Sequence, residues 1–228
     1  IFYGPSTLRL GMEKSRNLMT VRLAQYIGID KVADYAERLN VVDEMPEILS
    51  MALGAGETSL MRLTTAYAML VNGGKEITPT LIDRIQDRRG QTVFRHDDRA
   101  CANCANVAWD QHAAPIVPDT RAQLVSPAAA YQVVSMMEGV VQRGTGRTVR
   151  SVGKPLAGKT GTTNDALDTW FLGFSPDLAV GVYVGFDTPR TLGPSEQGAS
   201  AAAPIFRDFM DEALRGTPAI PFRIPPGV

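Results

Sequence analysis

The chain has 228 residues, of which 44% are hydrophobic and 21% charged, and its formal net charge is -1. This composition is that of one large globular domain with a sizeable core. The near-neutral charge gives no sign of a nucleic-acid partner, and no apolar run reaches the ~18 residues that a membrane span needs. Residues 1–5 lack a start methionine and a targeting pattern, so we interpret the chain as part of a longer protein.

Three helices are predicted in the first third of the chain. Apolar residues recur at helical spacing over residues 15–27, with Ser15 as a candidate N-cap, and Asp30 could cap a second helix. Ser59 opens a third apolar stripe, which Asn72-Gly73-Gly74 ends in the manner of a helix C-terminus.

The middle of the chain changes character. Residues 76–95 are typical of a hairpin, with its turn at Asp87-Arg88-Arg89-Gly90. Residues 96–125 show no clear periodicity, and we interpret them as a loop insertion.

The second half combines helices with antiparallel strands. Ser126-Pro127 predicts a helix start, because serine caps helices and proline fits their first position. The other elements expected are a strand over 154–162, a hairpin of 169–174 and 178–186, a closing helix over 205–213, and a loose Pro-rich tail from 217 to 228. Runs of helices and then strands indicate an α+β fold.

Residues 153–163 match two unrelated catalytic patterns. Gly153 to Thr160 satisfies G-x-x-x-x-G-K-[ST], the phosphate-binding P-loop, whereas Lys159-Thr160-Gly161 satisfies K-T-G, a signature of serine acyl-transfer enzymes. A P-loop needs a strand before it and a helix directly after it. Residues 161–165 are poor helix material, so we favour K-T-G and keep nucleotide binding as the alternative from another class.

The residue types around K-T-G suit an anionic substrate lying along an edge strand. Lys159 supplies a positive charge for a substrate carboxylate, and the hydroxyls of Thr160 and Thr162, beside Thr163, could hold that carboxylate or the scissile amide. Gly161 lets the substrate backbone approach closely. The backbone N–H of Thr162 could stabilise a tetrahedral oxyanion.

Further segments give the motif a context. Ser15-Arg16-Asn17 matches the S-x-N element of the same enzyme group. Residues 53–74, 143–146 and 157–187 resemble the class A, bifunctional penicillin-binding proteins, and the elements occur in family order over roughly residues 8–215. The resemblance implies the α+β fold shared with serine β-lactamases, an antiparallel sheet flanked by helices. Residues 1–215 would form the C-terminal portion of a transpeptidase domain, and 216–228 a Pro-rich tail.

The resemblance also implies a mechanism. In this family a serine attacks the D-Ala-D-Ala bond of a peptidoglycan stem peptide, and an amine from a second stem resolves the acyl-enzyme into a cross-link; β-lactams trap the same serine. Ser15 would relay a proton to the leaving amine, Asn17 would hydrogen-bond the substrate amide, and Lys159 would bind the terminal carboxylate with Thr160 and Thr162. A serine β-lactamase, a D,D-carboxypeptidase, a β-lactam sensor and a catalytically silent binding module remain alternatives.

The reactive serine itself is missing from the pattern. The family carries it in an S-x-x-K motif well upstream of S-x-N, and nothing before Ser15 fits. Ser151-Val152-Gly153-Lys154 spells the motif, but it lies in loop-like sequence and not at the start of a buried helix. We therefore expect the nucleophile to lie outside this chain, which alone should be inactive.

The resemblance sets the expected surroundings as well. The partners would be peptidoglycan stem peptides, β-lactams and other cell-wall synthesis proteins, at the periplasmic face of the bacterial inner membrane. Membrane contact would occur only through an N-terminal anchor outside the chain, and no cofactor or metal is expected. In an oxidising periplasm Cys101 and Cys104 would form a local disulfide; a zinc site made by His96, Cys101, Cys104 and His112, or free thiols, are the alternatives.

Several other residues have structural interpretations. Arg143, Arg147 and Arg150 are expected in a solvated loop before the K-T-G strand, with an acidic substrate as the alternative. Trp170, Phe171 and Phe174 are expected in the core. We expect structural hydrogen bonds, and not acid–base catalysis, from Asp165 and Asp168.

Overall fold

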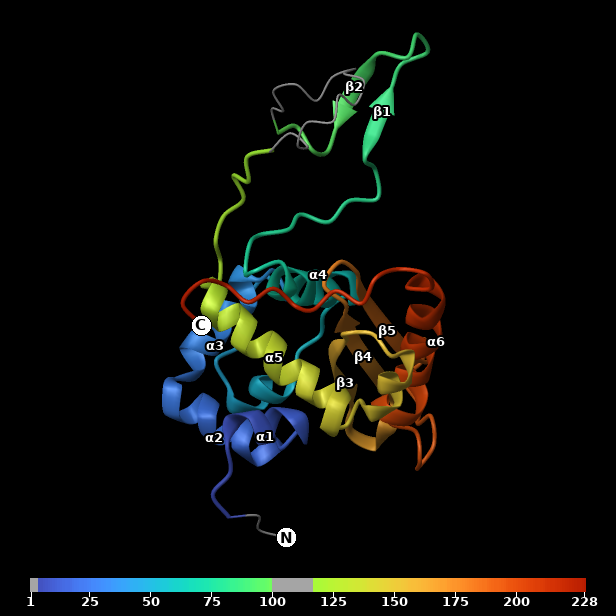
Figure 1. Cartoon of the computed structure of the whole chain (residues 1–228). Coiled ribbons are helices and arrows are strands. Elements are labelled where there is room, and N and C mark those ends of the chain that lie inside the picture. The colour runs from blue at the N-terminus through green and yellow to red at the C-terminus, as the bar shows by residue number, and fades with distance from the viewer. Residues whose placement is uncertain (1–3, 100–116) are drawn as a thin grey trace. The chain divides into compact units, whose positions relative to one another are not determined.

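The computed structural model describes residues 4–99 and 117–228 of the chain (Figure 1). It contains two compact units. The larger unit consists of Ile1–Glu76 and Gln123–Val228, and the smaller unit is Ile77–Ala122. Among the described residues, no helix combines the length and the apolar character needed to cross a membrane.

The larger unit contains six α-helices and three strands among its described residues. The helices are α1 (Leu8–Glu13), α2 (Asn17–Ile27), α3 (Ile29–Arg38), α4 (Leu60–Val71), α5 (Pro127–Arg143) and α6 (Ala203–Ala213). The strands are β3 (Ala157–Thr162), β4 (Asp168–Phe174) and β5 (Ala179–Gly185). Short helical turns are η1 (Leu49–Leu53), η2 (Arg147–Val152), η3 (Asn164–Ala166) and η4 (Gly198–Ala202). The predicted α+β class is confirmed.

The three strands form one antiparallel sheet in the order β3-β4-β5. Strand β3 lies at an edge, with Lys159 opposite Leu172 and Gly161 opposite Trp170. Because side chains alternate along a strand, neighbours in β4 point to opposite faces of the sheet. The edge position that the K-T-G interpretation requires is therefore present in the described part of the chain.

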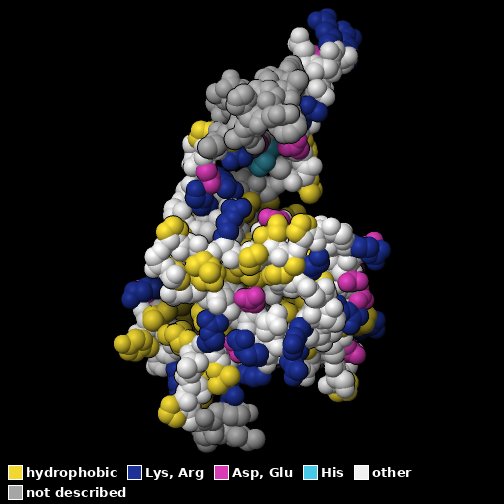
Figure 2. All heavy atoms as spheres, viewed as in Figure 1, with side chains coloured by type: hydrophobic (Ala, Val, Ile, Leu, Met, Phe, Trp, Pro, Cys, Tyr) yellow, Lys and Arg dark blue, Asp and Glu magenta, His cyan; other side chains and the backbone are white. Residues whose placement is uncertain are grey.

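Each face of the sheet is covered by helices. On one face Phe171 packs in a buried cluster with Phe206 and Met210 of α6. On the other face Phe174 packs in a second cluster with Val134 and Met137 of α5. Phe171 and Phe174 are fully buried, which confirms their predicted place in the core. Figure 2 shows Lys and Arg side chains scattered over the face in view, with acidic side chains between them.

Local sequence explains where several helices begin and end. The Ser59 hydroxyl accepts from the N–H of Arg62 at the start of α4, and the Ser126 hydroxyl accepts from Ala129 at the start of α5. Pro127 follows as the first residue of α5, as predicted. Gly73 and Gly74 have positive φ after α4, which confirms the predicted helix end.

Two predicted caps are wrong. Helix α2 begins at Asn17 after Arg16, and Ser15 lies outside it with a φ of +50°. Helix α3 begins at Ile29 after Gly28, so Asp30 lies within its first turn and does not cap it. In both places the chain turns sharply between two packed helices, and this turn overrides the local capping preference.

The P-loop interpretation is wrong. The segment before the motif is the short helix η2, and the segment after it is the antiparallel strand β4, reached by a tight turn. Among the described residues, no helix therefore begins directly after the motif to hold a phosphate at Lys159. The S-x-x-K look-alike is also no pair, because the Ser151 hydroxyl donates to the Thr148 carbonyl and the Lys154 ammonium to the Thr217 carbonyl.

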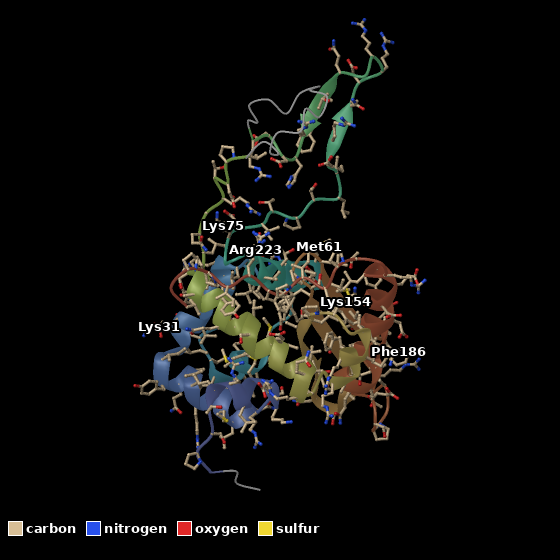
Figure 3. All side chains as sticks on the ribbon, in the orientation of Figure 1. Lys31, Met61, Lys75, Lys154, Phe186 and Arg223 are labelled. Atoms are coloured by element: carbon tan, nitrogen blue, oxygen red, sulfur yellow. The ribbon has the colours of Figure 1, made fainter. Side chains whose placement is uncertain are left out.

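The C-terminal tail is not loose, contrary to prediction. Phe222 is buried and meets Phe174 edge to face, with their ring centroids 5.7 Å apart. The Lys154 ammonium donates to the carbonyl of Thr217 at 2.5 Å (Figure 3 labels Lys154). A buried aromatic ring and a hydrogen bond to the backbone thus anchor a segment whose composition alone indicates a flexible end.

The smaller unit contains the predicted hairpin, formed by β1 (Arg84–Gln86) and β2 (Thr92–Arg95). Its turn is closed where the Asp87 carboxylate accepts from the N–H groups of Arg89 and Gln91. Cys101, Cys104 and His112 lie outside the described residues, so the disulfide remains a prediction.

Candidate active site

The half-buried side chain of Lys159 joins the two sequence motifs. Its ammonium donates to the Ser15 hydroxyl oxygen at 2.6 Å and to the Thr160 carbonyl at 2.9 Å. Ser15 reaches this position from the sharp turn between α1 and α2, 144 residues away in sequence. The fold therefore brings S-x-N and K-T-G into direct contact.

Burial changes the acidity of Lys159. Removal from water disfavours the charged form and lowers the pKa of this ammonium to about 8. At neutral pH the group is positive, yet its pKa is close enough to ambient pH for proton exchange. Since Ser15 accepts from Lys159, the serine's own hydrogen remains available to donate to a bound molecule.

Thr160 has a second hydroxyl beside it. The Oγ1 atoms of Thr160 and Thr145 are 2.7 Å apart, and either can be the donor. Thr145 belongs to the segment that follows α5. Whichever hydroxyl donates in this pair, the other keeps its own hydrogen, which is not used in this bond.

The remaining predicted site residues lie around this pair. Asn17 is exposed as the first residue of α2. A Cβ on Gly161 would lie 3.1 Å from the Cβ of Trp170, so glycine also relieves crowding within the sheet. The Thr162 hydroxyl accepts from the N–H of Gly198 at 3.0 Å. The Thr163 hydroxyl bonds only within the β3–β4 turn, donating to the Asp168 carbonyl and accepting from its N–H.

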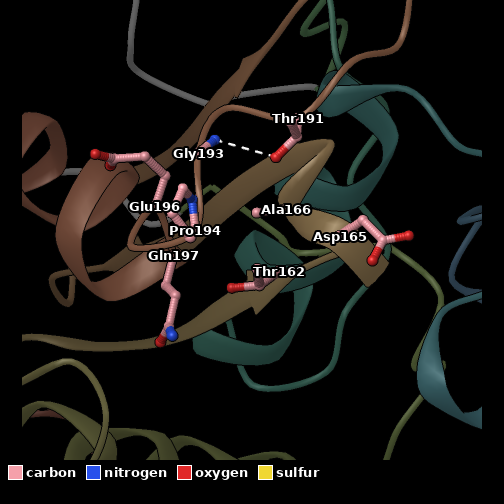
Figure 4. A pocket seen from close by; sticks show the side chains of 8 residues that line it. All are labelled: Thr162, Asp165, Ala166, Thr191, Gly193, Pro194, Glu196 and Gln197. Atoms are coloured by element: carbon pink, nitrogen blue, oxygen red, sulfur yellow. Dashed lines mark hydrogen bonds between the residues drawn. The ribbon is translucent and has the colours of Figure 1, made fainter.

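An open cavity of about 670 Å³ adjoins the Thr162 end of β3 (Figure 4). Its lining comes from the β3–β4 turn and from the segment after β5: Thr162, Asp165, Ala166, Thr191, Gly193, Pro194, Glu196 and Gln197. Asp165 and Ala166 have positive φ, of 58° and 49°, which is unusual for residues other than glycine. The Ala166 carbonyl accepts from the N–H of Leu192, which ties the two lining segments together.

Sequence reasoning missed three residues next to this site. Arg143 was expected in a solvated loop, but it is the last residue of α5 and forms an ion pair with Glu13. Thr145 lies in the segment 143–146 that carries the family resemblance, but no role was predicted for it, and Glu13 belongs to no motif. The structural hydrogen bond expected of Asp168 is present, because its carboxylate accepts from the Trp170 indole N–H at 2.8 Å.

Comparison with known proteins agrees with this arrangement. A family model described as the penicillin binding protein transpeptidase domain matches residues 2–211. The chain belongs to this family. Penicillin-binding protein 1A from Rickettsia bellii is 46% identical to it over 230 residues, and the alignment covers 100% of this chain. The protein of that name from Neisseria flavescens is 36% identical, again over 100% of this chain.

Solved structures of penicillin-binding proteins have the same fold. The crystal structure of penicillin-binding protein 1A from Haemophilus influenzae matches 99% of this chain and 37% of its own, with a TM-score of 0.83 and 30% identity. PonA1 from Mycobacterium tuberculosis, at 24% identity, matches with a TM-score of 0.78. The chain spans 29% of the length of the Rickettsia bellii relative and 27% of the Neisseria flavescens one.

Proposed function

We propose that the chain contributes to a D,D-transpeptidase, which cross-links peptidoglycan through a serine acyl-enzyme and is trapped by β-lactams. The observation that carries the proposal is the 2.6 Å contact between Lys159 and Ser15 on the edge strand β3, in a chain of the transpeptidase family. The reactive serine would come from residues of the whole protein outside these 228, since the one S-x-x-K sequence among them, Ser151 to Lys154, forms no contact between its serine and its lysine.

Each residue then has a defined part. Lys159 attracts the terminal carboxylate of the stem peptide, and its contact with Ser15 holds that hydroxyl toward the reacting centre. Ser15 passes a proton to the leaving amine. The hydroxyls of Thr160 and Thr162 bind the carboxylate, and Asn17 orients the substrate amide. The outer edge of β3 supplies backbone N–H groups to the oxyanion.

The proposal extends to the setting of the reaction. The substrates would be donor and acceptor stem peptides at the periplasmic face of the inner membrane, reached with the help of an anchor elsewhere in the protein. The 228 residues alone would form no covalent adduct with a β-lactam, because they lack the nucleophile. Mass spectrometry of the isolated chain after exposure to penicillin tests this point, and an adduct on Ser15 or Ser151 would contradict it.

The main test uses fluorescent penicillin on the full-length protein. We expect Ser15→Ala and Lys159→Ala each to lower the second-order rate constant of acylation by roughly a hundredfold or more, because both act in the transition state. Lys154→Ala is the matched control, since its ammonium bonds the Thr217 carbonyl and lies outside the motif contact. Unchanged acylation in Ser15→Ala would contradict the proposal.

A product assay separates the related activities. Incubation of the full-length protein with stem peptides carrying a donor and an acceptor should give cross-linked dimers and free D-alanine. Release of D-alanine without dimers would indicate a carboxypeptidase, and rapid turnover of the penicillin itself would indicate a β-lactamase.

A further inference from the structure

One charged residue is buried near the site without belonging to any motif. Glu13, the last residue of α1, is 4% exposed and is the only charged residue that is buried among residues 4–99 and 117–228. A buried carboxylate is costly unless it is paired and hydrogen-bonded. A carboxylate buried two residues before Ser15 therefore needs binding partners, and those partners fix the position of this part of the chain.

The partner of Glu13 is Arg143, the last residue of α5 (Figure 1 shows both helices). The guanidinium binds both carboxylate oxygens, with Nη2 to Oε1 at 2.5 Å and Nε to Oε2 at 3.3 Å. This fork fixes direction as well as distance. Two glycines shape the space, because a Cβ on Gly139 would lie 2.1 Å from Oε1 of Glu13, and one on Gly144 would lie 2.2 Å from its carbonyl oxygen.

Two hydrogen bonds to backbone carbonyls also connect the ends of α1 and α5. The N–H of Thr145 donates to the carbonyl of Glu13 at 3.1 Å, and the ammonium of Lys14 donates to the carbonyl of Arg143 at 2.7 Å. The ends of α1 and α5 are thus joined by an ion pair and two further hydrogen bonds. Little freedom remains for the residues that follow each helix.

The chain segments that follow α1 and α5 both hydrogen-bond side chains of β3. Two residues after Glu13, Ser15 receives the hydrogen bond of Lys159. Two residues after Arg143, Thr145 pairs with the hydroxyl of Thr160. The junction therefore sets how far the S-x-N turn lies from the K-T-G strand.

We infer that Glu13 and Arg143 are positioning residues, which hold Ser15 against Lys159 for the acyl-transfer reaction. The inference rests on the proposed function, because that function gives Ser15 its part. The physical reason for its importance is geometric, since a shift of about 1 Å in a catalytic group can cost roughly a hundredfold in rate.

The test measures acylation of the full-length protein by fluorescent penicillin in two backgrounds. With Ser15 present, Glu13→Gln should lower the acylation rate constant by roughly tenfold to a hundredfold. In the Ser15→Ala background the same change should alter the residual rate by less than about threefold, since Glu13 acts through Ser15. A purely structural role would lower the rate equally in both backgrounds.

Arg9→Ala provides the matched control. The Arg9 guanidinium also joins α1 to α5, donating to the carbonyl and the hydroxyl of Ser135, but it lies away from the Ser15 turn. Its removal should leave the acylation rate constant unchanged. Loss comparable to that of Glu13→Gln would overturn the inference, because any weakening of the helix contact would then suffice.

Arg143→Lys is a second variant that tests the same ion pair if the Glu13→Gln protein does not fold. The Arg143 side chain is 59% exposed, so lysine is accommodated and keeps the charge while losing the fork. We expect a smaller loss of rate that again requires Ser15. Unchanged acylation, or an equal loss without Ser15, overturns the inference. If Ser15→Ala alone has no effect, the proposed function fails instead.

Discussion

The middle of β3 and the turn that follows the strand are held by different kinds of contact. At Lys159 and Thr160, in the middle of the strand, Ser15 and Thr145 come from distant parts of the chain and hydrogen-bond the strand. In the β3–β4 turn, the Thr163 hydroxyl bonds Asp168, five residues further along the chain, beside an open cavity of about 670 Å³. The middle of the strand is therefore fixed by tertiary structure, whereas the Thr163 hydroxyl is held by a local turn beside open space.

This difference suits a strand that must bind one part of a substrate tightly and leave space for the rest of the substrate. Groups that stabilise charge work best when they are oriented before the ligand arrives. The middle of β3 meets that requirement, because the side chains of Lys159 and Thr160 already have partners. The cavity beside the β3–β4 turn leaves room for the remainder of a peptide, as the proposed function needs.

The largest expected effect is that of pH on the acylation rate constant, which depends on the charge of Lys159 in the middle of β3. Burial lowers the pKa of Lys159 to about 8, so the positive form prevails below that pH and is lost above it. If the charge binds the substrate carboxylate, the acylation rate constant should fall about tenfold for each pH unit above 8. A rate profile of the full-length protein from pH 6 to 10 measures this.

Lys159→Arg serves as the control for the pH profile. A guanidinium stays protonated throughout this range, so the descending limb near pH 8 should disappear even though the absolute rate is lower. A limb that persists in Lys159→Arg would assign the titration to another group. A rate that rises through pH 8 in the unaltered protein would mean that Lys159 works as a neutral base.

Paired threonine variants compare the middle of β3 with the turn directly. Thr160→Val removes a hydroxyl in the middle of the strand and should lower the acylation rate constant by roughly tenfold to a hundredfold, through a lost hydrogen bond to the substrate carboxylate. Thr163→Val should change it less than about threefold, while the free energy of unfolding falls by about 1 kcal/mol as the turn bonds are lost. Equal kinetic effects would contradict the proposed distinction between the middle of β3 and the turn.

The smallest effect is expected in the β3–β4 turn. Asp165 has a φ of +58°, which glycine adopts without strain. Asp165→Gly should raise the free energy of unfolding by up to about 1 kcal/mol and leave acylation unchanged. Asp165→Asn is the matched control and should be nearly neutral, because asparagine tolerates this conformation. Denaturant unfolding measures the stability of both variants. A loss of acylation in either variant would mean that the turn contributes to the active site.

Local patterns in the sequence predicted much of the fold. The caps at Ser59 and Ser126 and the β4–β5 hairpin are determined by residues close to them in sequence, so a single sequence can reveal them. The loose tail was mispredicted because the burial of Phe222 depends on Phe174, which is distant in the chain. Helix α1 was not predicted at all, since at six residues it is too short to show a periodic pattern.

For the site, the sequence by itself determined the chemistry: a lysine, hydroxyl groups and a glycine on a strand, and a serine–asparagine element far upstream. Only the tertiary structure decided the geometry. It joined Lys159 to Ser15, placed Ser15 outside the helix it was expected to cap, and paired Glu13 with Arg143. The physical reason is that motifs record which groups are present, whereas contacts between residues more than a hundred positions apart depend on how whole helices pack.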